Sequence, residues 1–299
     1  MLQRRQSTFS MRDSMIEGVI IKKIADFFYV AAGGEIYTAK ARGILKGKGR
    51  IVTGDRIMIS LNGDSDGTAA INKVLKRKNS LERPAVANVD MALLVVPVQS
   101  PPINTYIIDS FLVSLAHSNI DSVICFSKID LDEIGEYKKT LEAYKNIGYM
   151  TAEISNVTGH GVNYVKELLN GKITALCGAS GAGKSSLLNS IKSDLNLDTN
   201  QISERLQRGK NTTTYADLIK LNQDTYAVDT PGFTSFSLKG VKKEDLRFLF
   251  PEFDKYYKNC KFRGCLHNKE PGCMVKQAVN DGYIENFRYE NYLKLLLEL

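Results

Sequence analysis

The chain has 299 residues, of which 43% are hydrophobic and 24% charged, and this composition excludes general disorder and fibrous repeats. At roughly 100 to 200 residues per domain, the length predicts two or three domains. The best apolar run, Met91 to Val98, is far shorter than the roughly 18 residues that a membrane-spanning helix needs. We therefore expect no membrane-spanning segment and no membrane partner.

Positive charge is concentrated near the N-terminus. Residues 1–80 contain 15 Lys or Arg and 7 Asp or Glu, a net charge of +8, while the whole chain carries +7. Clustered basic residues favour a polyanionic partner, because binding releases condensed counterions. Nucleic acid is the first candidate and the one we expect, and an anionic membrane is the second. A merely solubilising surface explains the same cluster equally well.

Residues 1–14 are basic but lack the apolar segment of a secretory signal. Because Met11 and Met15 precede the first patterned residues, residues 1–14 are expected to be either a disordered extension or a start-site artefact. We expect the protein to be cytoplasmic. The cysteines number five, three of them between residues 260 and 273, which argues against a disulfide framework.

Residues 15–78 consist of short β-rich runs separated by glycine-rich breaks. Four or five strands at this spacing predict a small all-β barrel of the OB-like or SH3-like kind, whose basic face can carry nucleic acid. Phe28 and Tyr29 either stack on bases or fill the core of the barrel, and burial preferences favour the core.

Residues 79–238 alternate apolar runs with amphipathic helical patterns, which is typical of an α/β domain. Strands are predicted near residues 90–96, 122–126, 149–154 and 173–177, and helices near residues 106–118, 133–147 and 163–169. The alternation predicts a mainly parallel sheet with helices on both faces and ligands bound beyond the carboxyl ends of its strands. Residues 239–299 are predicted to form a third, mainly helical domain with short loops.

A candidate base-binding motif, Ser127, Lys128, Ile129 and Asp130, follows the second of these strands. A carboxylate there can accept hydrogen bonds from both N1–H and the 2-amino group of guanine, which adenine does not offer, and Lys128 would lie along the base. The usual motif is [NT]KxD, so the short side chain of Ser127 predicts a modest affinity for GTP. An ordinary exposed charge pair is the alternative. Ser155, after the next predicted strand, is a candidate for the last guanine-contacting loop.

A phosphate-loop motif, GxxxxGK[ST], follows the strand predicted over residues 173–177 and precedes a helical pattern. The residues expected to bind the nucleotide here are Gly178, Ala179, Ser180, Gly181, Ala182, Gly183, Lys184, Ser185 and Ser186. Glycines let the backbone wrap closely round a phosphate with its N–H groups pointing inward. Lys184 is expected to reach the β and γ phosphates and Ser185 to bind Mg²⁺, while the helix N-terminus adds partial positive charge. A flexible Gly/Ser linker is the alternative, which the flanking elements argue against.

Two further stretches suit the γ-phosphate. Asp229 and Gly232, in a DTPG sequence that follows a strand pattern at residues 225–228, are placed to contact a Mg²⁺-bound water and the γ-phosphate, although the same sequence is also a common turn. Between the phosphate loop and this turn, Thr212 and Thr213 lie in a polar stretch suited to a mobile loop, and Thr213 is the preferred residue to complete the Mg²⁺ shell. A plain Thr-rich strand entry is the alternative.

Phe233 stands where many small GTPases have a water-positioning glutamine. A phenyl ring cannot orient the attacking water, so slow unaided hydrolysis is predicted and the catalytic group is left unassigned.

Four potential metal ligands, Cys260, Cys265, His267 and Cys273, lie close together in the C-terminal part. Three thiolates and one imidazole satisfy tetrahedral zinc and leave no position for water, so the sequence predicts one structural Zn²⁺. The metal would add folding free energy to a region of about 60 residues that we expect to have little core of its own. Reduced cysteines in a small helical core are the alternative.

The base motif precedes the phosphate loop, which is a circular permutation of the order found in ordinary small GTPases. With the basic barrel before them and the Cys/His cluster after them, these motifs resemble the RsgA family of bacterial GTPases that depend on the small ribosomal subunit, from about Met15 onward. The cluster also matches the zinc motif of that family residue by residue. Two departures are Ser127, where the family has Asn, and Asn211, where it usually has His.

The resemblance implies a cytoplasmic, monomeric GTP hydrolase that binds GTP and GDP and acts in late assembly of the small ribosomal subunit, contacting its rRNA. We hypothesise that GTP orders residues 207–214 and 230–238, so that the barrel and the zinc domain clasp RNA until hydrolysis releases it. A GTP-gated RNA-binding module without significant hydrolysis is the alternative. A P-loop kinase of small molecules is a weaker one, since it leaves the base motif and the metal cluster unexplained.

Overall fold

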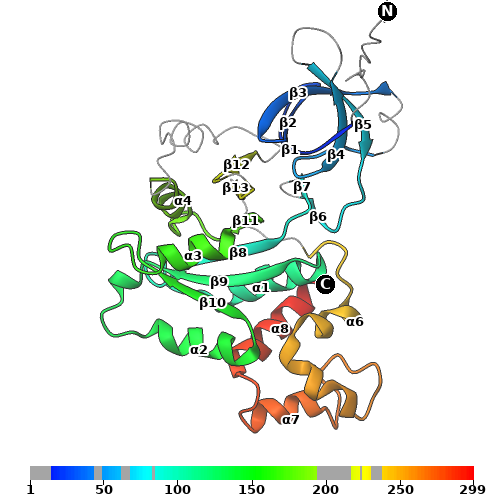
Figure 1. Cartoon of the computed structure of the whole chain (residues 1–299). Helices are drawn as coiled ribbons and strands as arrows, with labels where there is room; N and C mark the ends of the chain where they lie inside the picture. The colour runs from blue at the N-terminus through cyan, green and yellow to red at the C-terminus, as the bar shows by residue number, and fades with distance from the viewer. Residues whose placement is uncertain are drawn as a thin grey trace, which may run out of the picture. The chain divides into compact units, whose positions relative to one another are not determined.

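The structure is a computed structural model that describes residues 15–43, 49–61, 68–82, 85–193, 217–222, 224–229 and 238–299 (Figure 1). The chain divides into two compact units, one running up to Asn88 together with the segment that ends at Ile219, the other containing the rest from Val89 onward. The predictions for residues 1–14 and for Asn211, Thr212, Thr213, Gly232 and Phe233 lie outside the described residues. Among the helices that are described, none is long and apolar enough to cross a membrane.

The first unit is a closed five-stranded barrel, as predicted. Its strands are β1 (Ile16–Ile24), β2 (Phe27–Ala32), β3 (Glu35–Ala41), β4 (Arg56–Leu61) and β5 (Thr68–Val74). They close in the order β1-β2-β3-β5-β4, with β3 parallel to β5, which is an OB-like arrangement. Phe28 is 5% exposed and packs in the barrel core, while Tyr29 is half-buried, so the core assignment is correct for Phe28.

A buried ion pair holds the entry to β4. The Asp55 side chain is fully buried, and Arg77 donates to both of its carboxylate oxygens, at 2.6 and 2.9 Å. The same carboxylate accepts from the Val52 backbone N–H, and Arg77 also donates to the Arg50 carbonyl oxygen. Arg77 is therefore a structural residue rather than part of the free positive charge of the barrel. A short ribbon of β6 (Ser80–Glu82) and β7 (Ala85–Ala87) follows.

The second unit contains the predicted parallel sheet. Its strands are β8 (Met91–Pro97), β9 (Asp121–Ser127), β10 (Met150–Ile154), β11 (Ile173–Cys177), β12 (Leu218–Lys220) and β13 (Tyr226–Asp229). Its helices are α1 (Thr105–His117), the 3-10 turn η3 (Ile129–Leu131), α2 (Tyr137–Ile147), α3 (Val162–Leu169) and α4 (Lys184–Ser193). The strand order is β10-β9-β8-β11-β13-β12, and the first five strands are parallel to their neighbours. Only β12 has no counterpart among the predicted strands.

Burial of both sheet faces explains why the strands are apolar throughout. Every residue of β8 and β11 is buried, as expected for central strands of a parallel sheet that helices cover. Because the strands run in parallel, Ser127, Ile154, Cys177 and Asp229 all end at one edge of the sheet. This edge gathers the predicted motifs.

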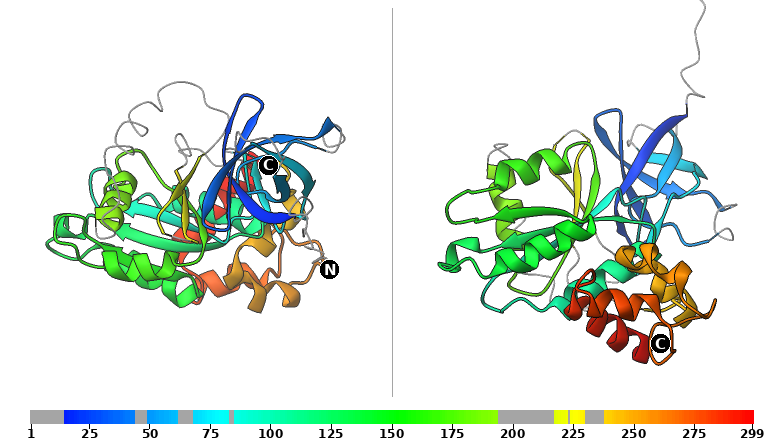
Figure 2. Two further views of the ribbon diagram at one scale, coloured as in Figure 1. Left: turned by 45° about the horizontal axis from the view of Figure 1, so that its top comes forward. Right: turned by 90° about the horizontal axis from the view of Figure 1, so that it is seen from below.

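The C-terminal region is mainly helical, as predicted. Its elements are α6 (Lys243–Leu246), η4 (Arg247–Leu249), η5 (Pro251–Lys255), η6 (Tyr257–Asn259), α7 (Met274–Asn280) and α8 (Asn286–Glu298). Figure 1 and Figure 2 show α8, in red, packed beside α1. Phe250, Phe253 and Tyr292 form an aromatic core that also includes Val113 of α1. The expectation of little core was wrong, because the apolar residues are dispersed in the sequence and α1 contributes to the same cluster.

Candidate nucleotide site and candidate metal centre

The phosphate loop lies between β11 and α4, in the predicted place. Gly178, Gly181 and Gly183 have positive φ angles of 127°, 76° and 94°. A Cβ added to Gly178 would lie 2.2 Å from the backbone oxygen of Val95, a distance that no side chain permits. Glycine is therefore required both for the left-handed backbone and for the close approach of the loop to β8.

Lys184 folds back over this loop. Its Nζ donates to the carbonyl oxygens of Gly178 and Ala179, at 2.8 Å each. The ammonium group therefore already lies over the loop that is expected to enclose the phosphates. Ser185 and Ser186, at the start of α4, are exposed and accessible to a ligand.

The base motif meets the phosphate loop at the sheet edge. Ser127 is fully buried, and its hydroxyl donates to the Ala182 carbonyl oxygen at 2.6 Å. Lys128 has a left-handed φ of 60°, and its Nζ donates to the Ser100 carbonyl oxygen at 2.8 Å. Asp130 is exposed in η3, with its carboxylate accessible for a ligand. The two motifs, separated in sequence and permuted in order, therefore share one site.

The loop after β10 also reaches this site. Ser155 is buried, and its hydroxyl oxygen accepts from the backbone N–H groups of Val157 and Thr158, which folds the loop into a tight turn. The next residue, Asn156, donates from Nδ2 to the Gly183 carbonyl oxygen at 3.2 Å. Sequence reasoning singled out Ser155 but missed Asn156. A polar side chain directly after Ser155, in a loop expected to lie beside Ser127, was the available signal.

Asp229 ends β13, paired in parallel with Leu176 of β11, so its backbone lies at the edge that bears the phosphate loop. Its side chain lies outside the described atoms, as do Thr212, Thr213 and Gly232 entirely. Of the residues predicted to bind Mg²⁺, the structure therefore describes Ser185 and the backbone of Asp229.

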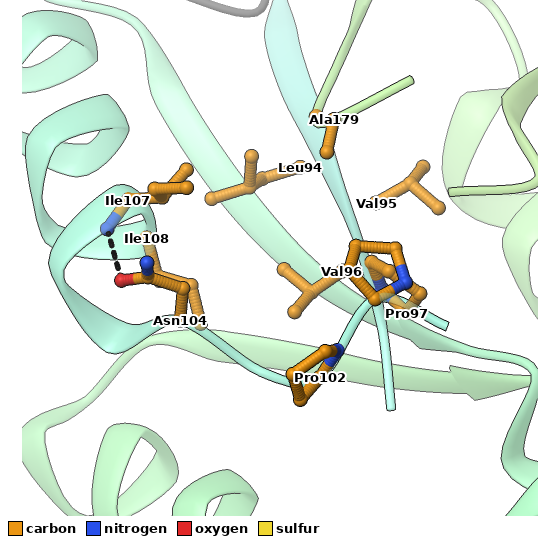
Figure 3. Close-up of a pocket in the computed structure, with 11 residues that line it drawn as sticks. Leu94, Val95, Val96, Pro97, Pro102, Asn104, Ile107, Ile108 and Ala179 are labelled. Carbon is orange, nitrogen blue, oxygen red and sulfur yellow. Dashed lines mark hydrogen bonds between the residues drawn. The ribbon is translucent and has the colours of Figure 1, made fainter. Parts of the chain in front are cut away.

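A small apolar cavity lies beside the phosphate loop (Figure 3). It measures about 50 Å³ and is lined by the end of β8, the start of α1 and residues Gly178 and Ala179. At its rim Asn104 caps α1, its side-chain oxygen accepting from the Ile107 backbone N–H at 3.2 Å. The cavity is too small for a nucleotide. It shows instead that the first turn of α1 packs directly behind the loop.

The four predicted metal ligands converge. The ligand atoms of Cys260, Cys265, His267 and Cys273 all lie within 4.8 Å of one another. His267 Nδ1 is 3.6 Å from Cys260 Sγ and 3.3 Å from Cys273 Sγ, and the two sulfurs are 4.0 Å apart. Ligand atoms of a tetrahedral zinc site lie about 3.5 to 3.8 Å apart, so the donor set and its spacing fit this ion.

The environment of the cluster prepares it for a cation. Burial lowers the pKa of His267 to about 4, so the imidazole is neutral and its Nδ1 can donate a lone pair. Burial also raises the pKa of Cys265 to about 12, so this thiol is neutral without a cation, and a bound cation would lower that pKa. The backbone N–H groups of Met274 and Lys276 point at the sulfurs of Cys260 and Cys273, which favours thiolates. The region can therefore hold a divalent metal ion.

Removing the metal is expected to loosen the C-terminal region but to leave the nucleotide site in place. We expect one metal ion per chain by elemental analysis and none in Cys265→Ser, with an unfolding midpoint about 5 to 10 °C lower. The effect is limited because Phe250, Phe253 and Tyr292 stay packed. Cys125→Ala, at a buried cysteine in β9, is the control and should retain the metal. Metal content unchanged in Cys265→Ser would contradict the assignment.

Two family models match the chain. Residues 74–239 match the model described as RsgA GTPase, and residues 17–69 match the model described as RsgA N-terminal domain. A protein of Clostridium botulinum named small ribosomal subunit biogenesis GTPase RsgA is 41% identical over 286 residues, 95% of this chain and 97% of the relative. A protein of the same name from Geobacillus thermodenitrificans is 40% identical over 290 residues, 95% of this chain and 98% of the relative.

Two solved structures share the fold along nearly the whole chain. The crystal structure of YjeQ from Thermotoga maritima is 37% identical with a TM-score of 0.83, covering 96% of this chain and 99% of that one. The structure of YloQ, described as a circularly permuted GTPase, is 31% identical with a TM-score of 0.80, covering 99% of this chain and 97% of that one. The predicted circular permutation is therefore confirmed, as is the predicted succession of a barrel, a GTPase domain and a C-terminal region with the Cys/His cluster.

Proposed function

Because the chain belongs to the RsgA GTPase family, whose members hydrolyse GTP, we propose that guanine nucleotide binds at the carboxyl edge of the sheet, between the base motif and the phosphate loop. The observation that carries this placement is the 2.6 Å hydrogen bond from Ser127 to Ala182, which joins the two motifs. In this arrangement Asp130 accepts from the base, Lys128 lies along it, and Lys184 contacts the β and γ phosphates.

Two metal ions complete the proposal. Mg²⁺ accompanies GTP, held by Ser185 with help from Asp229 and Thr213, and it neutralises charge on the phosphates. The ion at the Cys/His cluster is Zn²⁺ with a structural role, because the four protein ligands occupy all positions of a tetrahedron.

The proposed partner is the small ribosomal subunit, bound through its rRNA. The names of the relatives supply this partner, and the net charge of +8 on residues 1–80 suits an RNA surface. Because the proposed partner is ribosomal, we propose that the protein is cytoplasmic, and that it acts as a monomer. We also propose the domain limits 15–78 for the barrel, 79–238 for the GTPase domain and 239–299 for the zinc-binding domain.

GTP binding and hydrolysis are proposed to switch RNA binding on and off. Slow hydrolysis by the free protein follows from Phe233, whose ring cannot orient a water, so the subunit must supply or arrange the missing group. Equal RNA affinity of the GTP-like and GDP-bound protein would contradict the switch.

The proposal is tested by measuring GTP and ATP hydrolysis with and without purified small ribosomal subunits, at one fixed salt concentration. We expect GTP-selective hydrolysis that the subunit accelerates at least tenfold, and an acceleration that falls as salt rises, because contacts with rRNA phosphates are screened. Large ribosomal subunits at the same concentration are the control.

Two other outcomes have distinct meanings. Subunit binding without acceleration would favour a GTP-gated RNA-binding module. Neither binding nor acceleration would show that the ribosomal partner is wrong.

A further inference from the structure

Ser127 can make only part of the contacts expected at its position. A serine hydroxyl has a single hydrogen, and Ser127 donates it to the Ala182 carbonyl oxygen. The side chain is fully buried, so no water substitutes for a second donor. An asparagine at this position has two N–H hydrogens and a longer reach. One donor toward the phosphate loop and the base is therefore lacking on β9.

Asn156 supplies an amide at the same place from the neighbouring strand. Ile154, the last residue of β10, pairs with Ser127 in parallel register, so Asn156 lies in the loop next to the base motif. Its Nδ2 donates to the Gly183 carbonyl oxygen, the carbonyl that directly follows the one bound by Ser127. A hydroxyl and an amide from two adjacent strands therefore hold two consecutive carbonyls of the phosphate loop.

The fit between Asn156 and the phosphate loop depends on Gly183. Gly183 has a φ of 94°, and a Cβ added to it would lie 3.1 Å from Asn156 Nδ2. The Oδ1 atom of Asn156 is buried and has no hydrogen-bond partner among the residues that the structure describes. A buried acceptor without a partner is costly, so its presence beside a ligand loop points to a role in that site.

The loop that carries Asn156 is held rigidly enough to position it. The Ser155 carbonyl oxygen accepts from the Gly159 N–H at 2.9 Å, and the Ser155 N–H donates to the His160 carbonyl oxygen at 3.0 Å. With the two bonds to the Ser155 hydroxyl, these contacts close the turn on both sides. The amide is thus pre-organised before nucleotide arrives.

We propose that Asn156 is a positioning residue for guanine nucleotide, which ties the phosphate loop to the base-binding side of the pocket and compensates for Ser127. The proposal rests on the nucleotide site proposed above. Asn156 acts through Gly183 rather than through the reacting atoms. We therefore expect it to determine how long nucleotide stays bound and to leave the chemical step unchanged. Ser127 alone predicts a modest affinity for GTP, and Asn156 raises that affinity.

The test compares the full-length protein with Asn156→Ala, using a fluorescent GDP analogue in stopped flow. We expect Asn156→Ala to bind five- to tenfold more weakly, which is about the loss of one hydrogen bond, almost entirely through faster dissociation. The rate of hydrolysis at saturating GTP should change less than twofold. Asn146→Ala, at an exposed asparagine of α2, is the matched control and should bind like the unaltered protein.

A rescue experiment separates positioning from mere support of the loop. The double variant combines Asn156→Ala with Ser127→Asn, which introduces an amide at the end of β9. We expect this amide to recover at least half of the affinity that Asn156→Ala loses. Affinity unchanged within twofold in Asn156→Ala, or no recovery in the double variant when both variants unfold at the same temperature, would overturn the proposal.

Hydrogen exchange without nucleotide distinguishes this inference from the site on which it rests. Asn156→Ala should accelerate exchange of the amides of residues 178–184 in the nucleotide-free protein. If the unaltered protein failed to bind GDP while this acceleration was seen, the proposed nucleotide site would be wrong, but the positioning of the phosphate loop by Asn156 would be correct. If Asn156→Ala left the exchange of these amides unchanged, Asn156 would not position the loop.

Discussion

Replacing Arg288 by alanine should lower the free energy of unfolding by about 3 to 5 kcal/mol, since it leaves two buried carboxylates without their cation. Arg288 is 1% exposed and donates to both oxygens of Glu252, at 2.7 and 3.1 Å, and to Asp109 of α1. Burial alone would lower the pKa of Arg288, but Asp109 and Glu252 outweigh it and hold that pKa well above its ordinary value. The guanidinium therefore stays charged at neutral pH, as arginine does in proteins generally.

The hydrogen bonds around Asp109 explain why the loss is large. Tyr144 Oη donates to Asp109 Oδ1 at 2.6 Å, and Asn291 Nδ2 donates to Oδ2 at 2.7 Å, so the carboxylate is fully bonded only while Arg288 is present. Chemical denaturation followed by circular dichroism measures the change. Lys145→Ala, which breaks an exposed ion pair with Glu142, is the control and should cost less than about 1 kcal/mol.

A second set of variants tests whether unpaired charge is the cause. Arg288→Met combined with Asp109→Asn and Glu252→Gln removes all three charges and should recover at least half of the loss, because buried ion pairs are often replaceable by neutral residues. A loss no greater for Arg288→Ala than for Lys145→Ala would contradict the network as a major source of stability.

The same contacts bear on how nucleotide state is transmitted. Asp109 lies on α1, whose first turn packs behind the phosphate loop, and Arg288 lies on α8 of the C-terminal region. Because α1 and α8 share this ion network and an aromatic core, separating them would expose both. We therefore expect the metal-binding region to move with α1 rather than independently of it.

The phosphate loop and the metal cluster were predictable from the sequence because the residues that act together lie close together along the chain. The phosphate loop needs only Gly178 to Ser186 in one run, and the metal cluster needs only residues between 260 and 273. The network of Arg288 was not predictable in this way, because Asp109 and Glu252 lie 179 and 36 residues away and only the fold brings them together. Asn156 was missed because its partner Gly183 is 27 residues away, although its place directly after Ser155 was a signal that could have pointed to it.

Replacing Asp130 by asparagine should lower the affinity for GTP about 100-fold or more and create a preference for xanthosine triphosphate. The carboxylate of Asp130 accepts from both N1–H and the 2-amino group of guanine. An asparagine keeps one acceptor but presents N–H to the amino group, so two donors face each other and a buried polar group is left unpaired. Xanthine has a carbonyl oxygen at position 2. The N–H of the new amide can donate to this oxygen, while its Oδ1 still accepts from N1–H.

Competition binding with GDP, xanthosine diphosphate and ADP measures this change in preference. Asp132→Asn is the matched control, because Asp132 lies two residues away and its carboxylate accepts from the backbone N–H groups of Gly135 and Tyr137 instead of facing a ligand. These hydrogen bonds lower the pKa of Asp132, and the one from the Tyr137 N–H contributes most. The control therefore removes a nearby charge with only a local effect. If Asp130→Asn bound GDP as the unaltered protein does, the base would have to be recognised elsewhere. A preference for xanthine nucleotides in Asp130→Asn but not in Asp132→Asn would assign the choice of base to this single carboxylate, in spite of the serine that begins the motif.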